Sequence, residues 1–199
     1  MARSLIAITE GAGKALDTFQ RTVGGTALEG QIVILGLPFV ATYSVVASSI
    51  STATSAAHVL ELMAGVTNHV RVESFRIKQV VSAGAAAMLS IQLLRLTTAG
   101  TGGTGVTARP YDTADTVSAT AMTLAAVKGT EGVQLGQIDI PLRAAIVAAE
   151  YEYIWTTPPG VKPLIIPAGT ANGLTWKIVT GVATSTISIV VTFSETAEL

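Results

Sequence analysis

From about residue 31 to the C-terminus, hydrophobic and polar residues form short runs bounded by Gly, Ser, Thr and Pro. One run places Leu174, Trp176 and Ile178 at alternate positions, and the last places Val191 and Phe193 in the same way. Comparable runs cover residues 42–48, 58–63, 69–80, 87–96 and 150–155. Residues 161–166 are expected to form an edge strand, because Pro163 has no backbone N–H to donate to a neighbouring strand. A period of two is typical of β-strands with one buried face. Roughly eight to ten strands predict an all-β fold, an antiparallel β-sandwich of the jelly-roll type, with Trp176 and Phe193 in its core.

The run 69–80 changes parity in its middle. Val70 and Val72 occupy one parity, whereas Phe75 and Ile77 occupy the other. A β-bulge, in which one strand of an antiparallel pair has an extra residue, would bring the apolar residues before and after the change onto the same face of the sheet. The pattern therefore predicts a β-bulge near Ser74.

Residues 1 to about 30 lack a sustained period, and five glycines interrupt them. The apolar residues of this segment are Leu5, Ile6, Ile8, Leu16, Phe19 and Val23. A short helix over residues 15–23 is an alternative, although too few apolar residues are present to hold it alone. We interpret residues 1–30 as an extended N-terminal assembly arm and residues 31–199 as the β-sandwich domain. The six apolar side chains are expected to dock on a neighbouring subunit or capsid protein.

Composition changes this picture in one respect, because the chain is unusually poor in charge. Of 199 residues, 13% are charged and 49% are hydrophobic, while aromatic residues make up only 5%. The formal net charge is −1, which offers no electrostatic footprint for nucleic acid or an anionic membrane. Such a surface favours burial against copies of the same chain, so we expect a homo-oligomer.

A membrane span and secretion are both disfavoured. Residues 30–57 contain no Asp, Glu, Lys, Arg or His, and a stretch of this length could cross a bilayer. However, Pro38 and many hydroxyl side chains interrupt it. The N-terminal apolar run ends at Glu10 and is too short for a signal peptide. The chain has no cysteine, so it has neither disulfides nor thiolate metal sites.

A glycine motif is the first candidate for chemistry. Gly100, Gly102 and Gly105 match G-x-G-x-x-G, the dinucleotide fingerprint, but Val106 and Pro110 follow where a helix is required. We therefore expect residues 97–108 to form a long exposed loop without a bound nucleotide. The run Gly11, Gly13 and Lys14 lacks the remaining residues of a Walker A loop.

The two histidines, His58 and His69, each begin a predicted strand. Hydrolysis would require a nucleophile and an orienting acid nearby, and no G-x-S-x-G elbow is present. A metal would require a third ligand that the spacing does not supply. We interpret both as histidines at strand ends whose replacement changes little, and assign no catalytic residue, cofactor or metal ligand.

Two pairs of carboxylates are further candidates for chemistry. Glu150 and Glu152 share one strand face, as paired acids of a glycosidase would, but Tyr151, Tyr153 and Trp155 on the opposite face indicate an ordinary strand. Asp112 and Asp115 suit either a calcium-binding loop or an Asx turn. The turn is the more common structure, and the calcium alternative stays open.

Three segments carry a resemblance to a known class of proteins. They are Val70, Arg71, Val72, Arg76 and Ile77, then residues 94–107 with the sequence LRLTTAGTGGTGVT, then Pro110, Asp112 and Asp115. This pattern resembles structural proteins of tailed bacteriophages, and the segment around Phe19, Gln20 and Arg21 is similar to the N-terminal part of such proteins.

The resemblance implies a β-sandwich that serves as a building block on the surface of a virion capsid. It suggests a capsid decoration or cement protein, a non-enzymatic homotrimer that contacts the major capsid protein. The small share of charged residues agrees with this role, because symmetric contacts between copies would bury a weakly charged surface.

Three other functions remain open. The chain could be a tail-fibre or spike module that contacts a host surface, or a carbohydrate-binding module in which Trp155, Trp176 or the tyrosines stack on sugar rings. The parity of these aromatics, which places them in the core, disfavours sugar binding. An enzyme is disfavoured by the scarcity of polar constellations.

Overall fold

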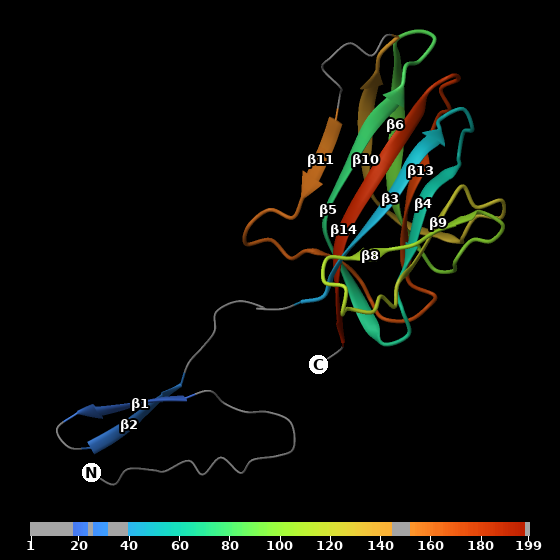
Figure 1. The fold of residues 1–199 in the computed structure, drawn as a ribbon. Helices are drawn as coiled ribbons and strands as arrows, with labels where there is room; N and C mark the ends of the chain where they lie inside the picture. The colour runs from blue at the N-terminus through green and yellow to red at the C-terminus, as the bar shows by residue number, and fades with distance from the viewer. Residues whose placement is uncertain (1–17, 24–25, 32–39, 145–151, 198–199) are drawn as a thin grey trace. The chain divides into compact units, whose positions relative to one another are not determined.

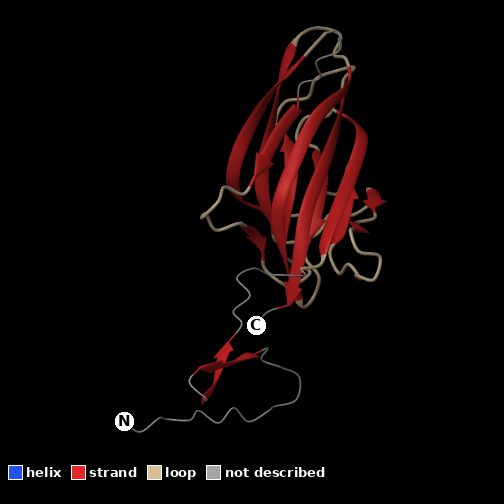
Figure 2. Ribbon diagram, turned by 60° about the vertical axis from the view of Figure 1, so that its left-hand side comes forward, coloured by secondary structure: helices blue, strands red, loops and turns tan. Residues whose placement is uncertain are grey.

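The computed structural model describes residues 18–23, 26–31, 40–144 and 152–197 of the chain. The chain divides into two units, Met1–Phe39 and Val40–Leu199. Within the described residues every helix or strand element is a β-strand (Figures 1 and 2), which confirms the all-β prediction. That part of the chain contains no helix long and apolar enough to cross a membrane.

The N-terminal unit contains one pair of antiparallel strands. β1 (Thr18–Val23) pairs with β2 (Thr26–Gln31), and Val23 lies opposite Thr26. The alternative of a helix over residues 15–23 is therefore wrong for its described part. Of the six predicted arm residues, Phe19 and Val23 lie on β1, whereas Leu5, Ile6, Ile8 and Leu16 lie outside the described residues.

The second unit consists of two antiparallel sheets. The sheet that we call the β6 sheet has the order β10 (Glu131–Leu142), β6 (Ala87–Leu96), β13 (Gly173–Ile178), β4 (His58–Met63), β9 (Thr120–Thr123), β7 (Thr104–Val106). The β5 sheet has the order β11 (Glu152–Thr156), β5 (Asn68–Val81), β14 (Thr186–Ala197), β3 (Thr42–Ser51), β8 (Arg109–Pro110), and β12 (Leu164–Ile166) also pairs with β5. The predicted antiparallel β-sandwich is confirmed.

The core lies between the two sheets, and both contribute alternate side chains to it (Figure 1). Trp176 of the β6 sheet and Phe193 of the β5 sheet are fully buried, as predicted. Phe75 joins the sheets, because its ring packs edge-on against Trp176 with centroids 5.4 Å apart and stacks on Trp155 at 5.2 Å. Aromatic rings in these arrangements add to the stabilisation from buried area.

The predicted β-bulge near Ser74 is confirmed. In the pairing of β14 with β5, Thr192 lies opposite Ser74 and Phe193 opposite Val72, so Glu73 is the extra residue. The bulge keeps the apolar side chains before and after it on the inner face of the sheet. All four residues whose parity suggested the bulge belong to the core: Val70, Val72, Phe75 and Ile77.

The expectation of an exposed loop holds for most of the segment 97–108, since eight of its twelve residues are exposed, but two features differ. Gly100 and Ala108 are buried, and Thr104–Val106 forms β7, which pairs with β9. The glycines do not leave the segment unpacked. They allow its backbone to approach the β6 sheet, where a cluster of charged side chains holds it.

Candidate functional site: a buried histidine–glutamate network

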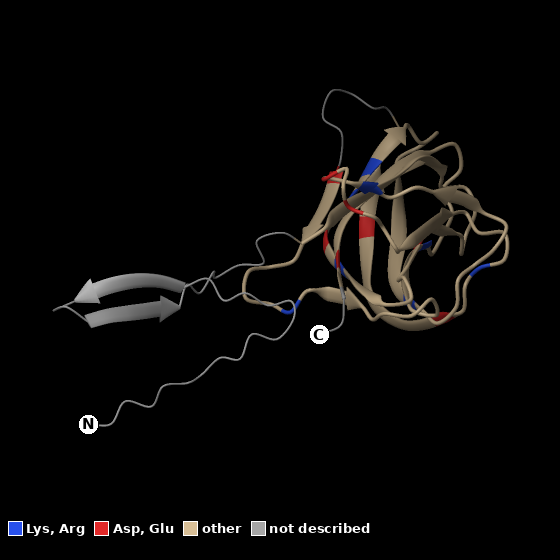
Figure 3. Cartoon of the chain, turned by 60° about the horizontal axis from the view of Figure 1, so that its bottom comes forward, with Lys and Arg blue, Asp and Glu red and all other residues tan. Residues whose placement is uncertain are grey.

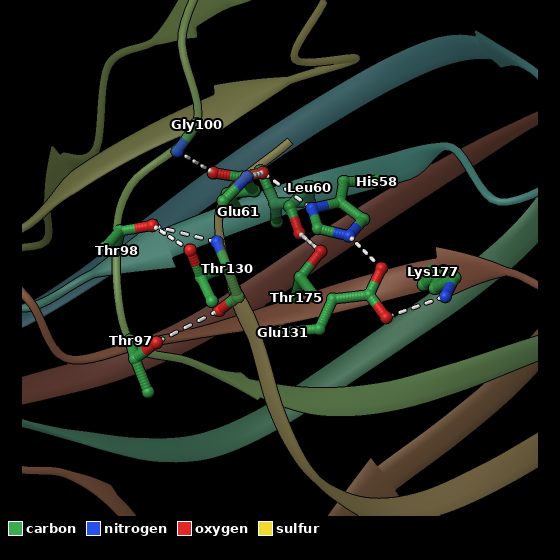
Figure 4. A network of polar contacts seen from close by, with 11 residues as sticks. His58, Leu60, Glu61, Thr97, Thr98, Gly100, Thr130, Glu131, Thr175 and Lys177 are labelled. Atoms are coloured by element: carbon green, nitrogen blue, oxygen red, sulfur yellow. Dashed lines mark hydrogen bonds and ion pairs between the residues drawn. The ribbon is translucent and has the colours of Figure 1, made fainter. Parts of the chain in front are cut away.

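The outer face of the β6 sheet carries the candidate site, a network of His58, Glu61, Glu131 and Lys177 (Figure 4). All six residues of β4 are buried, so this strand is covered on both faces. The register with β13 shifts between the pairs Trp176–Leu60 and Lys177–His58. This irregularity leaves His58 and Glu61, three positions apart, in direct contact.

His58 stands between two carboxylates, and its side chain is fully buried. Nδ1 lies 2.6 Å from Oε1 of Glu61, and Nε2 lies 3.1 Å from Oε1 of Glu131. An ionised carboxylate only accepts hydrogen bonds. Both ring nitrogens of His58 therefore face hydrogen-bond acceptors, and the ring bridges Glu61 and Glu131.

Glu61 is 1% exposed and receives three hydrogen bonds. Besides His58, the backbone N–H of Gly100 donates to Oε2 at 2.7 Å and the N–H of Gly129 donates to Oε1 at 3.0 Å. Burial by itself raises the pKa of Glu61. Hydrogen bonds from His58, Gly129 and Gly100 outweigh this effect and hold the pKa below its ordinary value, so the carboxylate stays ionised.

Glycine is required at both backbone donors. A Cβ at position 100 would stand 2.7 Å from Oε1 of Glu61, and one at position 129 would collide with the carbonyl oxygen of Thr98. Neither contact leaves room for a side chain. Gly100 in the segment 97–108 and Gly129 thus let two stretches of backbone bind one buried carboxylate.

Glu131 extends the network toward the surface. Its Oε2 accepts a hydrogen bond from Nζ of Lys177 at 2.7 Å, while its other oxygen faces His58. Burial raises the pKa of Glu131, but hydrogen bonds from Lys177 and His58 lower it by more, so this carboxylate is also held ionised.

Threonine side chains fasten the two loops that the network holds (Figure 4). The N–H of Thr130 donates to Oγ1 of Thr98 at 2.8 Å, and the N–H of Thr97 donates to the carbonyl oxygen of Thr130 at 3.0 Å. In the adjacent strand, Oγ1 of Thr175 donates to the carbonyl oxygen of Leu60 at 3.0 Å. The network therefore anchors residues 97–100 and 128–131 to the β6 sheet.

A small cavity of about 170 Å³ adjoins the network, with Glu61, Met63, Gly103 and Met122 in its lining. The oxygens of Glu61 already accept hydrogen bonds from the protein. No cluster of three or more His, Cys, Asp or Glu residues suited to a metal occurs in the described ranges. The arrangement acts as an electrostatic anchor for the loops.

A second buried carboxylate anchors another loop to the β5 sheet. Glu195, near the end of β14, accepts hydrogen bonds from the N–H of Ala119 at 2.7 Å and from the hydroxyl of Ser118 at 2.7 Å. The N–H of Ser118 and the side-chain amide of Asn68 also donate to it. Both buried glutamates thus hold backbone that lies far away in the sequence.

The histidines occupy the positions expected of them, but one has a different role. Both lie at the start of a strand, and His69 is half-buried on β5. His58 is fully buried with both ring nitrogens bonded, which overturns the expectation that its replacement would change little. β4 lies inside its sheet, between β13 and β9, so its first residue is not exposed.

The other candidates are not brought together. Glu150 lies outside the described residues, and Glu152 forms a 3.7 Å ion pair with Arg76. Tyr153 and Trp155 pack against the core, as their parity predicted. Asp112 makes the predicted Asx turn, since its Oδ1 accepts the N–H of Ala114 at 3.0 Å. The glycine fingerprint leads into the strand β7 instead of a helix.

Sequence reasoning missed Glu61, Glu131 and Lys177. One signal was present, because Glu61 is the only formally charged residue in the apolar run HVLELM. A lone acid in a buried strand requires a partner. The partner His58 was three positions away, but Glu131 and Lys177 are distant in the sequence.

The comparisons with known proteins give no relative, since no family model, curated protein or solved structure matches this chain.

Proposed function

We propose that this protein is a non-enzymatic structural protein of a virion, a capsid decoration protein that stabilises a phage head through contacts between copies. The observation that carries the proposal is the pairing order of the eight principal strands. β3 pairs with β14, β4 with β13, β5 with β11, and β6 with β10. The first strand thus pairs with the last, the second with the seventh, and so on inward, and this nested order supports the interpretation as a jelly roll. Viral capsid and lectin domains use this fold.

The surface chemistry supports a structural role. Lys, Arg, Asp and Glu occupy few positions of the sandwich unit (Figure 3), and within the network Glu131 and Lys177 form an ion pair. Exposed hydrophobic side chains remain, with Val66 and Val133 each 72% exposed. A weakly charged surface with exposed apolar groups suits a molecule that neighbours cover in an assembly.

The N-terminal unit supports the same role. Among the described strands, β1 and β2 pair only with each other. An isolated two-stranded hairpin is marginally stable in water. Docking of residues 1–30 on a neighbouring copy or on the major capsid protein would supply the missing contacts, with Phe19 and Val23 among the arm's apolar residues.

Sedimentation velocity and a glycan array test the proposal together. We expect a stable homo-oligomer, a trimer, at micromolar concentration and no glycan binding. An image of the native particle should then show the protein on the capsid surface. A monomer at micromolar concentration would contradict the assembly role, and specific glycan binding would favour a host-contacting or carbohydrate-binding module.

A further inference from the structure

The β6 sheet has one long open edge, the strand β10. β10 spans 12 residues, whereas the other edge strands are short: β7 has 3 residues, β8 has 2, β11 has 5 and β12 has 3. Short edge strands offer few free backbone groups to a further strand. The C-terminal half of β10 is also protected, since Pro141 has no N–H. The N-terminal half is open.

Residues 131–137, which we call the β10 edge segment, are mostly exposed and pair irregularly with β6. Six of the seven residues are exposed and the remaining one, Gly136, is half-buried. Register shifts leave Gly132, Val133 and Leu135 without a partner residue in β6. Val133 is 72% exposed and Leu135 is 42% exposed. Apolar side chains on an open edge mark a place where another strand can pair.

The sequence of this segment, EGVQLGQ, is nearly symmetric about Gln134. Two copies in antiparallel orientation place Val133 opposite Leu135 and Gly132 opposite Gly136. Glu131 then lies opposite Gln137, so no like charges meet, and Gln134 lies opposite its own copy. A twofold axis brings residue i of one copy opposite residue j of the other, and j opposite i. The near-symmetry therefore places residues of similar size opposite each other across the axis.

Gly136 adds a second observation. A Cβ at this position would meet no atom within 4 Å, and its φ is not among the positive values of the described glycines. Neither packing nor backbone conformation within the subunit therefore requires glycine there. A glycine in a strand also marks the close approach of another backbone.

We propose that two copies of this chain join edge to edge through β10, antiparallel and centred on Gln134, so that their β6 sheets become continuous. Val133 of each copy then lies opposite Leu135 of the other, and Gln134 lies opposite its own copy. The biological meaning of this contact rests on the proposed assembly role. A pair of seven-residue strands covers less than the roughly 1,600 Å² of a standard interface, so the contact is weak in dilute solution and strengthens between copies that other contacts hold together.

Single cysteines test the register, because the chain has none of its own. Gln134→Cys places two thiols directly across the axis, where Cα atoms about 4.5–5.5 Å apart allow a disulfide. Gln137→Cys is the matched control in the same exposed segment, since the two copies of that residue stand about 20 Å apart, six residues along the strand. In oxidising buffer at high protein concentration, Gln134→Cys should form disulfide-linked dimers at least about tenfold faster than the control.

The outcomes separate this contact from the proposed function. Equal rates for the two variants, or no dimer from Gln134→Cys, overturn the β10 contact. If the wild-type protein is still an oligomer by sedimentation, the assembly proposal stands without it. A wild-type monomer at micromolar concentration overturns the assembly proposal, and selective crosslinking of Gln134→Cys at higher concentration would still support the contact.

Discussion

Replacement of Glu61 by Gln tests whether the buried network anchors the loops of the β6 sheet. The change keeps the shape of the side chain and removes its charge. Three donors point at the carboxylate, namely the ring of His58 and the N–H groups of Gly100 and Gly129. In the amide, an NH₂ group takes the place of one accepting oxygen and faces a donor.

The cost follows from these contacts. A hydrogen bond to a charged group contributes about 1.5–3 kcal/mol, and breaking a buried ion pair by removing one partner costs about 3–5 kcal/mol. The contacts share one carboxylate and do not add, so we expect Glu61→Gln to lower the free energy of unfolding by about 3–5 kcal/mol at pH 7. For a domain of this size the melting temperature should fall by on the order of 10 °C.

The dependence on pH adds a second readout. The pKa of Glu61 is lower in the folded protein than its ordinary value of 4.5. The ionised carboxylate therefore stabilises the fold fully above that value, and this contribution is lost as the pH falls through the folded-state pKa. The difference in stability between wild type and Glu61→Gln should be constant near neutral pH and shrink in acid below about pH 4.5.

Urea unfolding followed by tryptophan fluorescence, from pH 7 to pH 3, measures both effects. Glu152→Gln is the matched control, because its 3.7 Å contact with the exposed Arg76 should contribute less than about 1 kcal/mol. The reasoning fails if Glu61→Gln costs no more than the control at pH 7. It also fails if its deficit is unchanged in acid.

Three further predictions rest on other parts of the fold. His58→Ala should lower the free energy of unfolding by about 3–5 kcal/mol in the same urea experiment, because it removes the side chain that bridges two carboxylates and takes from the buried Glu61 its side-chain partner; a loss below about 1 kcal/mol would contradict the anchoring role of the network. Trp176→Ala should cost about 3–5 kcal/mol by loss of buried contacts, and near-wild-type stability would show that this part of the core repacks freely. Deletion of residues 1–30 should leave the unfolding midpoint of the sandwich nearly unchanged and weaken the oligomer in sedimentation; an unfolded product would show that the segment belongs to the core.

The alternation of apolar residues did not predict β10 (Glu131–Leu142) or the short strands β7, β8 and β9. It was sufficient to predict the other eight strands of the sandwich unit, the two-layer class and the bulge near Ser74. These features depend on which face of a strand each side chain occupies. Because successive side chains point to opposite faces, a period of two in the sequence shows which residues share a face. The core positions of Trp176 and Phe193 followed from the same parity. The Asx turn at Asp112 is local as well, since its donor lies two residues away.

The tertiary structure alone decided which strands are neighbours and what the buried charges contact. β3 and β14 pair across most of the sandwich sequence, and His58 meets Glu131 from 73 positions away. The local sequence pattern does not identify such partners, because strand pairing depends on how the whole chain packs. The glycines at 100 and 129 resemble those of an unpacked loop in sequence, yet it is the missing side chain that lets their backbone reach Glu61.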